Sequence, residues 1–93
     1  MAERPRALQL DPADNVAVAV TALHPGEVVL AVELREPIRF GHKLALRDIA
    51  AGEPILKYHE VIGRASEDIA AGAHVHVHNV VSARLPGPQD RAA

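Results

Sequence analysis

The sequence predicts an all-β protein, a single compact domain of short strands joined by glycine turns. Three observations favour this fold class. The apolar runs of the 93-residue chain are short and mostly end at a turn residue, which is typical of strands. No apolar pattern of period 3.6 continues long enough for an ordinary helix. A five-residue segment, Asp-Ile-Ala-Ala-Gly, occurs twice, and each copy ends in a glycine suited to a tight turn.

The first two predicted strands are the most regular. Residues 15–20, Asn-Val-Ala-Val-Ala-Val, carry a β-branched residue at every second position, as a half-buried strand does. Residues 28–35 place apolar side chains on one face, and Pro-Gly before them and Pro37 after them mark the ends. Shorter strands or bends are expected at residues 44–46, 55–58 and 60–63, and a final strand at residues 74–81.

The predicted domain occupies most of the chain. Residues 1–8 are polar and are expected to form a flexible N-terminus. Residues 9–82 contain all the predicted strands and are expected to form the β domain. Residues 83–93 contain two prolines and a glycine and are expected to form a flexible C-terminal tail.

The repeated segment covers residues 48–52 and 68–72. It belongs to a wider pattern, apolar-x-x-Gly-x-x-apolar, in which the glycine allows a turn of positive φ before a strand begins. We therefore expect Gly52 and Gly72 to be equivalent turn glycines with positive φ. The pattern occurs at Leu23–Gly26–Val29, Ile38–Gly41–Leu44, Ile49–Gly52–Ile55 and Ile69–Gly72–Val75.

The composition excludes several classes of function. Aromatic residues are only 2% of the chain, and the formal net charge is −2, so neither base stacking nor a basic face for nucleic acid is expected. The chain has no cysteine, which excludes disulfides and thiolate metal sites. It has no run near the roughly 18 apolar residues of a membrane span, and its first residues lack the apolar stretch of a secretory signal. We expect a soluble, cytoplasmic protein without nucleic-acid or membrane partners.

Residues 74–79, His-Val-His-Val-His-Asn, are the strongest candidate site. On a strand, His74, His76 and His78 would share one face, while Val75 and Val77 would face the core. Neighbouring imidazoles about 6.6 Å apart at their roots can converge on one ion, with metal–nitrogen distances of about 2.0–2.1 Å. A nitrogen and oxygen ligand set suits Fe(II), Mn(II) or Zn(II). The alternative is a solvated strand face that happens to carry histidines.

Two further segments carry candidate polar groups. After Gly41, His42 and Lys43 are placed where they could hold a carboxylate, or they are exposed polar residues at the start of a strand. Tyr58 lies between a lysine and a histidine, but a lone tyrosine in a small β domain is more often a packing residue. No pair of carboxylates has the spacing of a general acid and base, so no catalytic residue is assigned.

Four segments together resemble the small N-terminal domain of the altronate/galactarate dehydratase family. They are residues 41–58 (GHKLALRDIAAGEPILKY), 62–65 (IGRA), 68–72 (DIAAG) and 74–79 (HVHVHN). Residues 14–19 (DNVAVA) resemble the first strand of that domain, and the resemblance covers about residues 8–81. The family's small domain belongs to the SAF group, so the resemblance implies a β-clip fold. Two positions depart from the family pattern: Val77 stands where threonine is common, and His59 where glycine is common.

The resemblance implies a sugar-acid lyase. Members of the family remove water from a sugar acid to give a 2-keto-3-deoxy acid, with a divalent metal that is usually iron, Fe(II). Matching positions make His42 and Lys43 candidate substrate-binding residues, and His74, His76 and His78 candidate metal ligands. The family's large domain is missing from this sequence, which implies a small subunit that is inactive alone and needs a large catalytic lyase subunit as partner. The chain also resembles the small subunit of sulfolactate sulfo-lyase, and a third alternative is a non-catalytic SAF module for ligand binding or assembly. Whether the chain forms homo-oligomers stays open.

Overall fold

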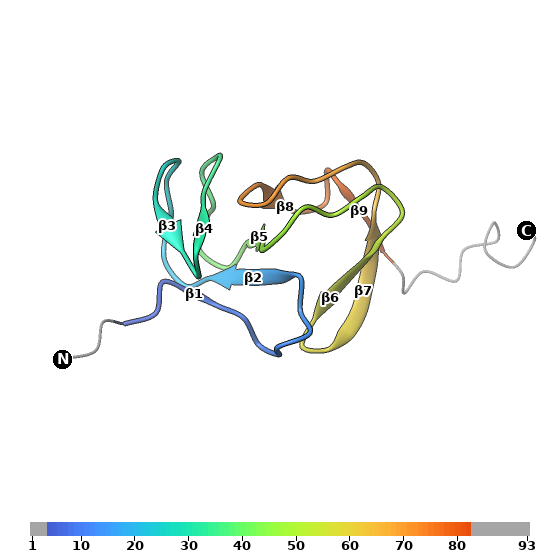
Figure 1. Cartoon of the computed structure of the whole chain (residues 1–93), viewed down its shortest axis with the longest axis horizontal. Helices are drawn as coiled ribbons and strands as arrows, with labels where there is room; N and C mark the ends of the chain where they lie inside the picture. The colour runs from blue at the N-terminus through green and yellow to red at the C-terminus, as the bar shows by residue number, and fades with distance from the viewer. Residues whose placement is uncertain (1–3, 83–93) are drawn as a thin grey trace, which may run out of the picture.

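The computed structural model describes residues 4–82 and confirms the all-β fold class (Figure 1). The described residues contain short strands and turns and no helix. No helix in this part of the chain is therefore long and apolar enough to cross a membrane. The strands are β1 (Ala7–Leu8), β2 (Val16–Ala19), β3 (Val28–Val29), β4 (Val32–Glu33), β5 (Lys43–Ala45), β6 (Pro54–Lys57), β7 (Glu60–Ala65), β8 (His74–Val75) and β9 (Val80–Ser82).

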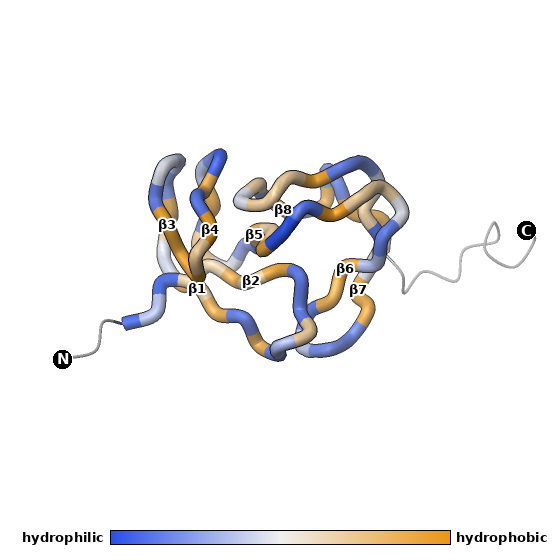
Figure 2. The backbone as a smooth tube through the Cα atoms, in the orientation of Figure 1, coloured by the Kyte–Doolittle hydropathy of each residue, from blue (hydrophilic) through white to orange (hydrophobic). Residues whose placement is uncertain are grey.

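The strands form three small antiparallel sheets. The four-stranded sheet has the order β1-β2-β5-β8, the two-stranded sheet pairs β3 with β4, and the three-stranded sheet has the order β6-β7-β9. Figure 1 shows β3 and β4 at one end of the domain, β6 and β7 at the other, and β2 and β5 between them. Figure 2 shows hydropathy changing within a few residues along the whole tube, as short buried strands between polar turns require.

Two apolar clusters form the core, one on each side of the central strands. Side chains that alternate along β2 and β5 contribute to both, because successive residues of a strand point to opposite faces. The first cluster contains Ala7, Ala17, Ala19, Leu23, Val29, Leu34, Ile38 and Leu44. The second contains Val16, Ala45, Ile49, Ile55, Ala65, Ile69 and Val75.

The pattern of glycine turns is confirmed at all four places. Each glycine has positive φ, between 83° and 89°, as predicted for Gly52 and Gly72. In each turn the backbone N–H of the residue after the glycine donates a hydrogen bond to the carbonyl of the residue two places before the glycine. The apolar residues on both sides of the four glycines are buried: Leu23, Val29, Ile38, Leu44, Ile49, Ile55, Ile69 and Val75.

The two copies of Asp-Ile-Ala-Ala-Gly face each other across a local twofold arrangement. The backbones of Ile49 and Ile69 exchange two hydrogen bonds, each 2.7 Å long. The Asp48 carboxylate accepts a hydrogen bond from the backbone N–H of Ala71 at 2.9 Å, and the Asp68 carboxylate accepts one from Ala51 at 2.8 Å. The repeat therefore encodes one reciprocal contact made twice.

The predicted strand at residues 28–35 is wrong, because the chain reverses in its middle. Val28–Val29 pairs with Val32–Glu33 around a two-residue turn in which Leu30 and Ala31 have φ of 50° and 65°. Val29 rather than Val28 faces the core, and Leu30 is exposed. Such turns usually carry glycine or asparagine, so the sequence gives no signal for this one.

A second hairpin joins β6 to β7 through Tyr58 and His59, whose φ values are 55° and 63°. Buried Asp14 supports the turn, because its two carboxylate oxygens accept hydrogen bonds from the N–H groups of Tyr58 and His59 at 2.7 and 2.8 Å. The positive φ of His59 is the physical reason that glycine suits this position. Tyr58 is 70% exposed, so the expectation that it packs in the core is wrong.

The boundary expected near residue 8 is also corrected. Ala7 and Leu8 form β1 and pair with Ala19 and Val18 of β2. Ala7 is buried in the first core cluster together with Ala17 and Ala19 of β2. Residues 1–3 and the expected tail at residues 83–93 lie outside the described residues.

Candidate functional site

The histidine segment does not form the single strand that the sequence predicts. Only His74 and Val75 belong to β8, and the chain then turns before β9. Asn79 holds this turn together: its side-chain oxygen accepts from the N–H of His76 at 3.0 Å, and its amide donates to the carbonyl of His74 at 2.8 Å. Val77 is therefore 81% exposed rather than facing the core as predicted. Asparagine is a common turn residue, but sequence reasoning assigned Asn79 no role.

The turn nevertheless gathers imidazoles, and it adds one from another strand. Leu44 of β5 pairs with His74 of β8, which brings His42, just before β5, beside the histidine segment. The rings of His42, His74 and His76 stack nearly parallel, with centroids 4.1–5.4 Å apart. The ring of His78 is tilted against His74 at 5.1 Å. We call His42, His74 and His76 the histidine triad.

A direct hydrogen bond links two rings of the triad. The Nδ1 atom of His42 and the Nε2 atom of His74 are 2.8 Å apart. One of these nitrogens donates and the other accepts, so at least one of the two rings is neutral. Neutral imidazole is the form that binds metal ions.

Burial and the repulsion of neighbouring charges favour the neutral forms of His74 and His76. Desolvation lowers the pKa of His74, and the neighbouring charges of His42, His78 and His76 lower it further. Desolvation also lowers the pKa of His76, as do the charges of His42 and Lys43. A lowered pKa makes the imidazoles of His74 and His76 available as neutral ligands near neutral pH.

One carboxylate near the triad, that of Glu36, was not predicted from the sequence. The Glu36 side chain accepts a hydrogen bond from the backbone N–H of His74 at 2.8 Å, and its charge opposes the lowering of the His74 pKa. Glu36 lies 38 residues before His74 and precedes a proline in a loop, so no spacing rule points to it. The Glu36 carboxylate thus accepts a hydrogen bond from a backbone N–H of β8.

The triad offers a set of three nitrogen donors for a divalent metal. One nitrogen from each ring can be chosen so that all three lie within 4.8 Å of one another. The residues therefore fit the metal that the family resemblance implies. The predicted ligand set was His74, His76 and His78, whereas the structure groups His42 with His74 and His76. Metal binding itself stays a prediction.

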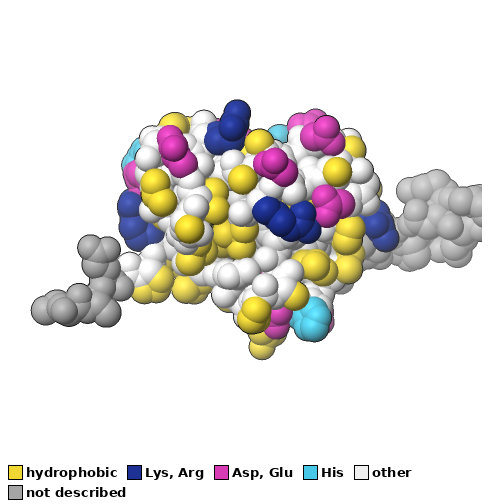
Figure 3. All heavy atoms as spheres, in the orientation of Figure 1, with side chains coloured by type: hydrophobic (Ala, Val, Ile, Leu, Met, Phe, Trp, Pro, Cys, Tyr) yellow, Lys and Arg dark blue, Asp and Glu magenta, His cyan; other side chains and the backbone are white. Residues whose placement is uncertain are grey.

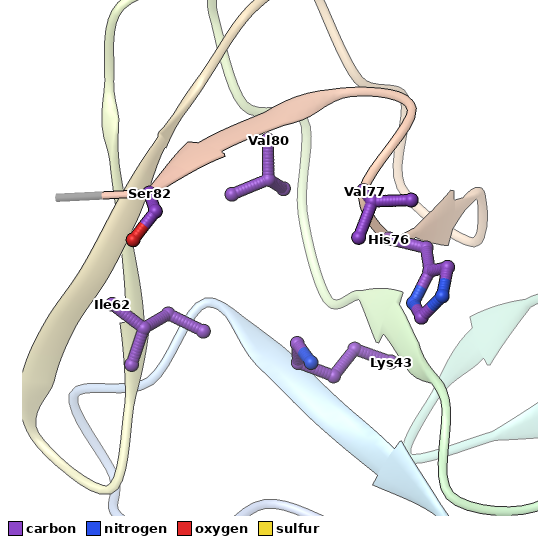
Figure 4. A pocket seen from close by; sticks show the side chains of 6 residues that line it. All are labelled: Lys43, Ile62, His76, Val77, Val80 and Ser82. Atoms are coloured by element: carbon purple, nitrogen blue, oxygen red, sulfur yellow. The ribbon is translucent and has the colours of Figure 1, made fainter. Parts of the chain in front are cut away.

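Lys43 extends from β5 into a hollow of about 230 Å³ next to the triad (Figure 4). Burial lowers the pKa of Lys43, and the nearby charge of Lys57 lowers it further. Figure 4 shows Lys43 and His76 on one side of the hollow, and Ile62, Val80 and Ser82 on the other. Val77 completes the lining.

Acidic and basic side chains are interspersed on the face of the molecule that Figure 3 shows. Histidines lie only near the edges of this face. This face carries no single-sign field of the kind that steers a highly charged polymer.

Comparison with known proteins bears on this site. The altronate/galactarate dehydratase SAF domain matches residues 5–83. The chain is 47% identical over 76 residues to altronate dehydratase of Escherichia coli K12. This match covers 77% of this chain and 15% of that protein. It is 49% identical over 55 residues to the alpha subunit of (2R)-sulfolactate sulfo-lyase of Chromohalobacter salexigens, covering 59% of this chain and 58% of that subunit. A third match, 38% over 82 residues, is to galactarate dehydratase (L-threo-forming) of Escherichia coli K12, covering 85% of this chain and 16% of that protein.

The chain thus spans only about a sixth of the dehydratases that it matches, but more than half of the sulfo-lyase subunit. The family match includes every described strand, both copies of the repeat, and all three members of the triad. The chain belongs to the altronate/galactarate dehydratase SAF domain family.

Proposed function

We propose that the chain is the small subunit or domain of a divalent-metal-dependent lyase that removes water from a sugar acid of the altronate or galactarate type. The observation that supports this proposal is that Lys43 lines one hollow together with His76, a member of the histidine triad. Residues more than thirty positions apart supply these groups, in a domain whose relatives include altronate and galactarate dehydratases.

The proposed reaction removes a proton from the carbon next to the carboxylate and a hydroxyl from the following carbon. The resulting enol rearranges to a 2-keto-3-deoxy acid. A bound divalent metal, Fe(II) in the first instance, would act as a Lewis acid on the departing hydroxyl. The triad of His42, His74 and His76 would hold this metal through neutral imidazoles, and Lys43 would hold an acidic group of the substrate.

The proton-abstracting base is assigned to a partner. The described residues offer no pair of carboxylates beside the triad, and one small domain gives few groups that converge on a substrate. We therefore propose a large catalytic lyase chain that covers the exposed side of the site. The cytoplasmic location expected from the sequence stays a prediction.

A second function is favoured by one comparison. The match covers 58% of the sulfo-lyase alpha subunit but only 15% of altronate dehydratase, so the relative of which this chain covers the larger share is a separate subunit. The chain could therefore serve a lyase that releases sulfite from (2R)-sulfolactate. The same site would then hold a smaller acid that carries a sulfonate.

Reconstitution tests both functions. The chain is assayed alone and after co-expression with a large lyase chain of the same genome, for keto-acid formation from altronate or galactarate and for sulfite release from (2R)-sulfolactate. We expect no turnover by the chain alone and turnover of one substrate class by the complex. Substantial turnover by the chain alone would contradict the need for a partner. Failure of every candidate large chain to co-purify would favour a non-catalytic SAF module.

Metal titration tests the triad itself. Calorimetry with Zn(II) on the full chain should show one site whose affinity falls at least about tenfold in His76→Gln, because one of three imidazoles is lost. His59→Asn is the matched control, since His59 is exposed outside the triad and asparagine tolerates its positive φ. Because the pKa values of His74 and His76 lie below the ordinary value of about 6.5, binding should weaken as the pH falls below that value and these imidazoles become protonated. Equal zinc affinity in the wild type and His76→Gln at every pH would contradict metal binding by the triad and would indicate that these histidines are solvated surface residues.

A further inference from the structure

Lys43 is a half-buried cation without a carboxylate partner in the part of the chain that the structure describes. None of the ion pairs among residues 4–82 includes Lys43. The charge of another cation, Lys57, lowers its pKa, as does burial. Removing an ammonium group from water without a counter-ion is costly, so such a group is a candidate binding site for an anion.

The walls around Lys43 are mostly apolar. Ile62, Val77 and Val80 line the hollow, and they come from β7, the turn after β8, and β9. Apolar walls offer the half-buried ammonium group no polar partner and lower the local polarity, which strengthens its attraction for a negative charge. They also suit a short hydrocarbon segment and give few partners to a chain of hydroxyl groups.

We propose that this hollow is a subsite for one oxyanion group of the acid substrate, with Lys43 as its counter-ion. The oxyanion is a carboxylate or a sulfonate, and the carbon attached to it lies against Ile62, Val77 and Val80. Because His76 lines the same hollow and belongs to the triad, the rest of the substrate extends toward the imidazoles. The inference rests on the proposed function, since it names the substrate group that Lys43 receives.

The test uses the full chain, labelled with ¹⁵N and kept free of metal by a chelator. Sodium propionate and sodium ethanesulfonate are titrated separately, and each amide is followed by NMR. Propionamide serves as an uncharged probe of similar shape. We expect millimolar binding of at least one anion, with the largest shifts at Lys43, Ile62, Val77 and Val80, and no saturable shifts with propionamide. Binding should weaken with added salt.

Variants identify the group responsible. Lys43→Met keeps the aliphatic stem and should weaken anion binding at least about tenfold, as loss of a charge-assisted contact does. Lys43→Arg keeps the charge and should retain most of the binding. Lys57→Met is the control, because Lys57 lies near Lys43 but does not line the hollow. The dispersion of each spectrum shows that the variant is folded.

The outcomes separate this inference from the proposed function. Tighter binding of propionate assigns the subsite to a carboxylate, and tighter binding of ethanesulfonate assigns it to a sulfonate. Equal shifts in the wild type and Lys43→Met, or no saturable shift with either anion, would overturn the subsite. An inactive reconstituted complex with intact anion binding would contradict the lyase function and leave the subsite standing.

Discussion

The two copies of Asp-Ile-Ala-Ala-Gly make the same contacts and end in different surroundings. In both, the isoleucine is buried, the aspartate accepts a hydrogen bond from the other copy, and the glycine has positive φ, 89° at Gly52 and 85° at Gly72. A Cβ atom on Gly52 would meet no atom within 4 Å. A Cβ atom on Gly72 would collide with the backbone carbonyl oxygen of Glu33 in β4.

The difference shows that identical sequence does not impose identical demands. The turn at Gly72 packs against the β3–β4 hairpin, and the carbonyl of Gly72 accepts a hydrogen bond from Arg35 at 3.0 Å. This turn leads into His74, whereas the turn at Gly52 leads into Pro54 and the β6–β7 hairpin. The second copy therefore joins the two ends of the domain and positions the triad. The expectation that the two glycines are equivalent holds for backbone conformation and is wrong for packing.

The largest effect is expected for Gly72→Ala. Both positive φ and the collision with Glu33 oppose a methyl group, so the free energy of unfolding should fall by about 3–5 kcal/mol. Urea unfolding followed by circular dichroism measures the change. Because the collision can push the turn away from β4, zinc affinity of the triad should fall in the folded fraction.

Gly52→Ala is the matched control for that variant. It has the same backbone strain and open space around the new methyl group, so we expect a loss of only about 1 kcal/mol. Losses of equal size at the two glycines would show that the contact with Glu33 yields easily, and the comparison would fail.

The isoleucine pair should behave alike. Ile49 and Ile69 are both almost fully buried in the second core cluster, so Ile49→Ala and Ile69→Ala should each lower the free energy of unfolding by about 2–5 kcal/mol. The measurement is urea unfolding under the same conditions. A much smaller loss at one position would mean that the core collapses around only one copy of the repeat.

The aspartate pair should show smaller and equal effects. Each of Asp48→Ala and Asp68→Ala removes one acceptor from an exposed backbone N–H, and water can replace it, so we expect about 0.5–1.5 kcal/mol per site. Thermal unfolding of the single and double variants measures both losses. Additive losses are expected, because the two hydrogen bonds share no atoms.

Acidification should affect the second copy more than the first. The pKa values of His74 and His76 are lowered in the folded chain, mainly by burial, with Lys43 and the other imidazoles adding repulsion. Below about pH 6.5 these two histidines bind more protons in the unfolded chain than in the folded chain. The free energy of unfolding therefore decreases as the pH falls and increases again as it rises.

Amide hydrogen exchange in the presence of a chelator measures this asymmetry. After correction for the intrinsic pH dependence of exchange, protection near Gly72 should decrease between about pH 7 and pH 5.5 more than protection near Gly52. His76→Gln should reduce the asymmetry. Equal loss of protection at both turns would assign the acid sensitivity to groups outside the triad.

The sequence by itself determined the local conformations that depend on neighbouring residues. The spacing of apolar residues around Gly26, Gly41, Gly52 and Gly72 predicted all four turns and the burial on both sides of them, because a positive φ and a short strand are set within six or seven residues. The absence of a helical period predicted the all-β class. The segment from His74 to Asn79 was correctly singled out as a place where imidazoles gather.

Only the tertiary structure decided which groups meet. The turns at Leu30–Ala31 and Tyr58–His59 lack the usual glycine or asparagine, and for the second the support comes from Asp14, more than forty residues away. The triad takes His42 through the pairing of β5 with β8, and Asn79 bends the expected strand so that Val77 faces solvent. These features depend on contacts between distant segments, and a residue's neighbours in sequence do not determine its neighbours in space.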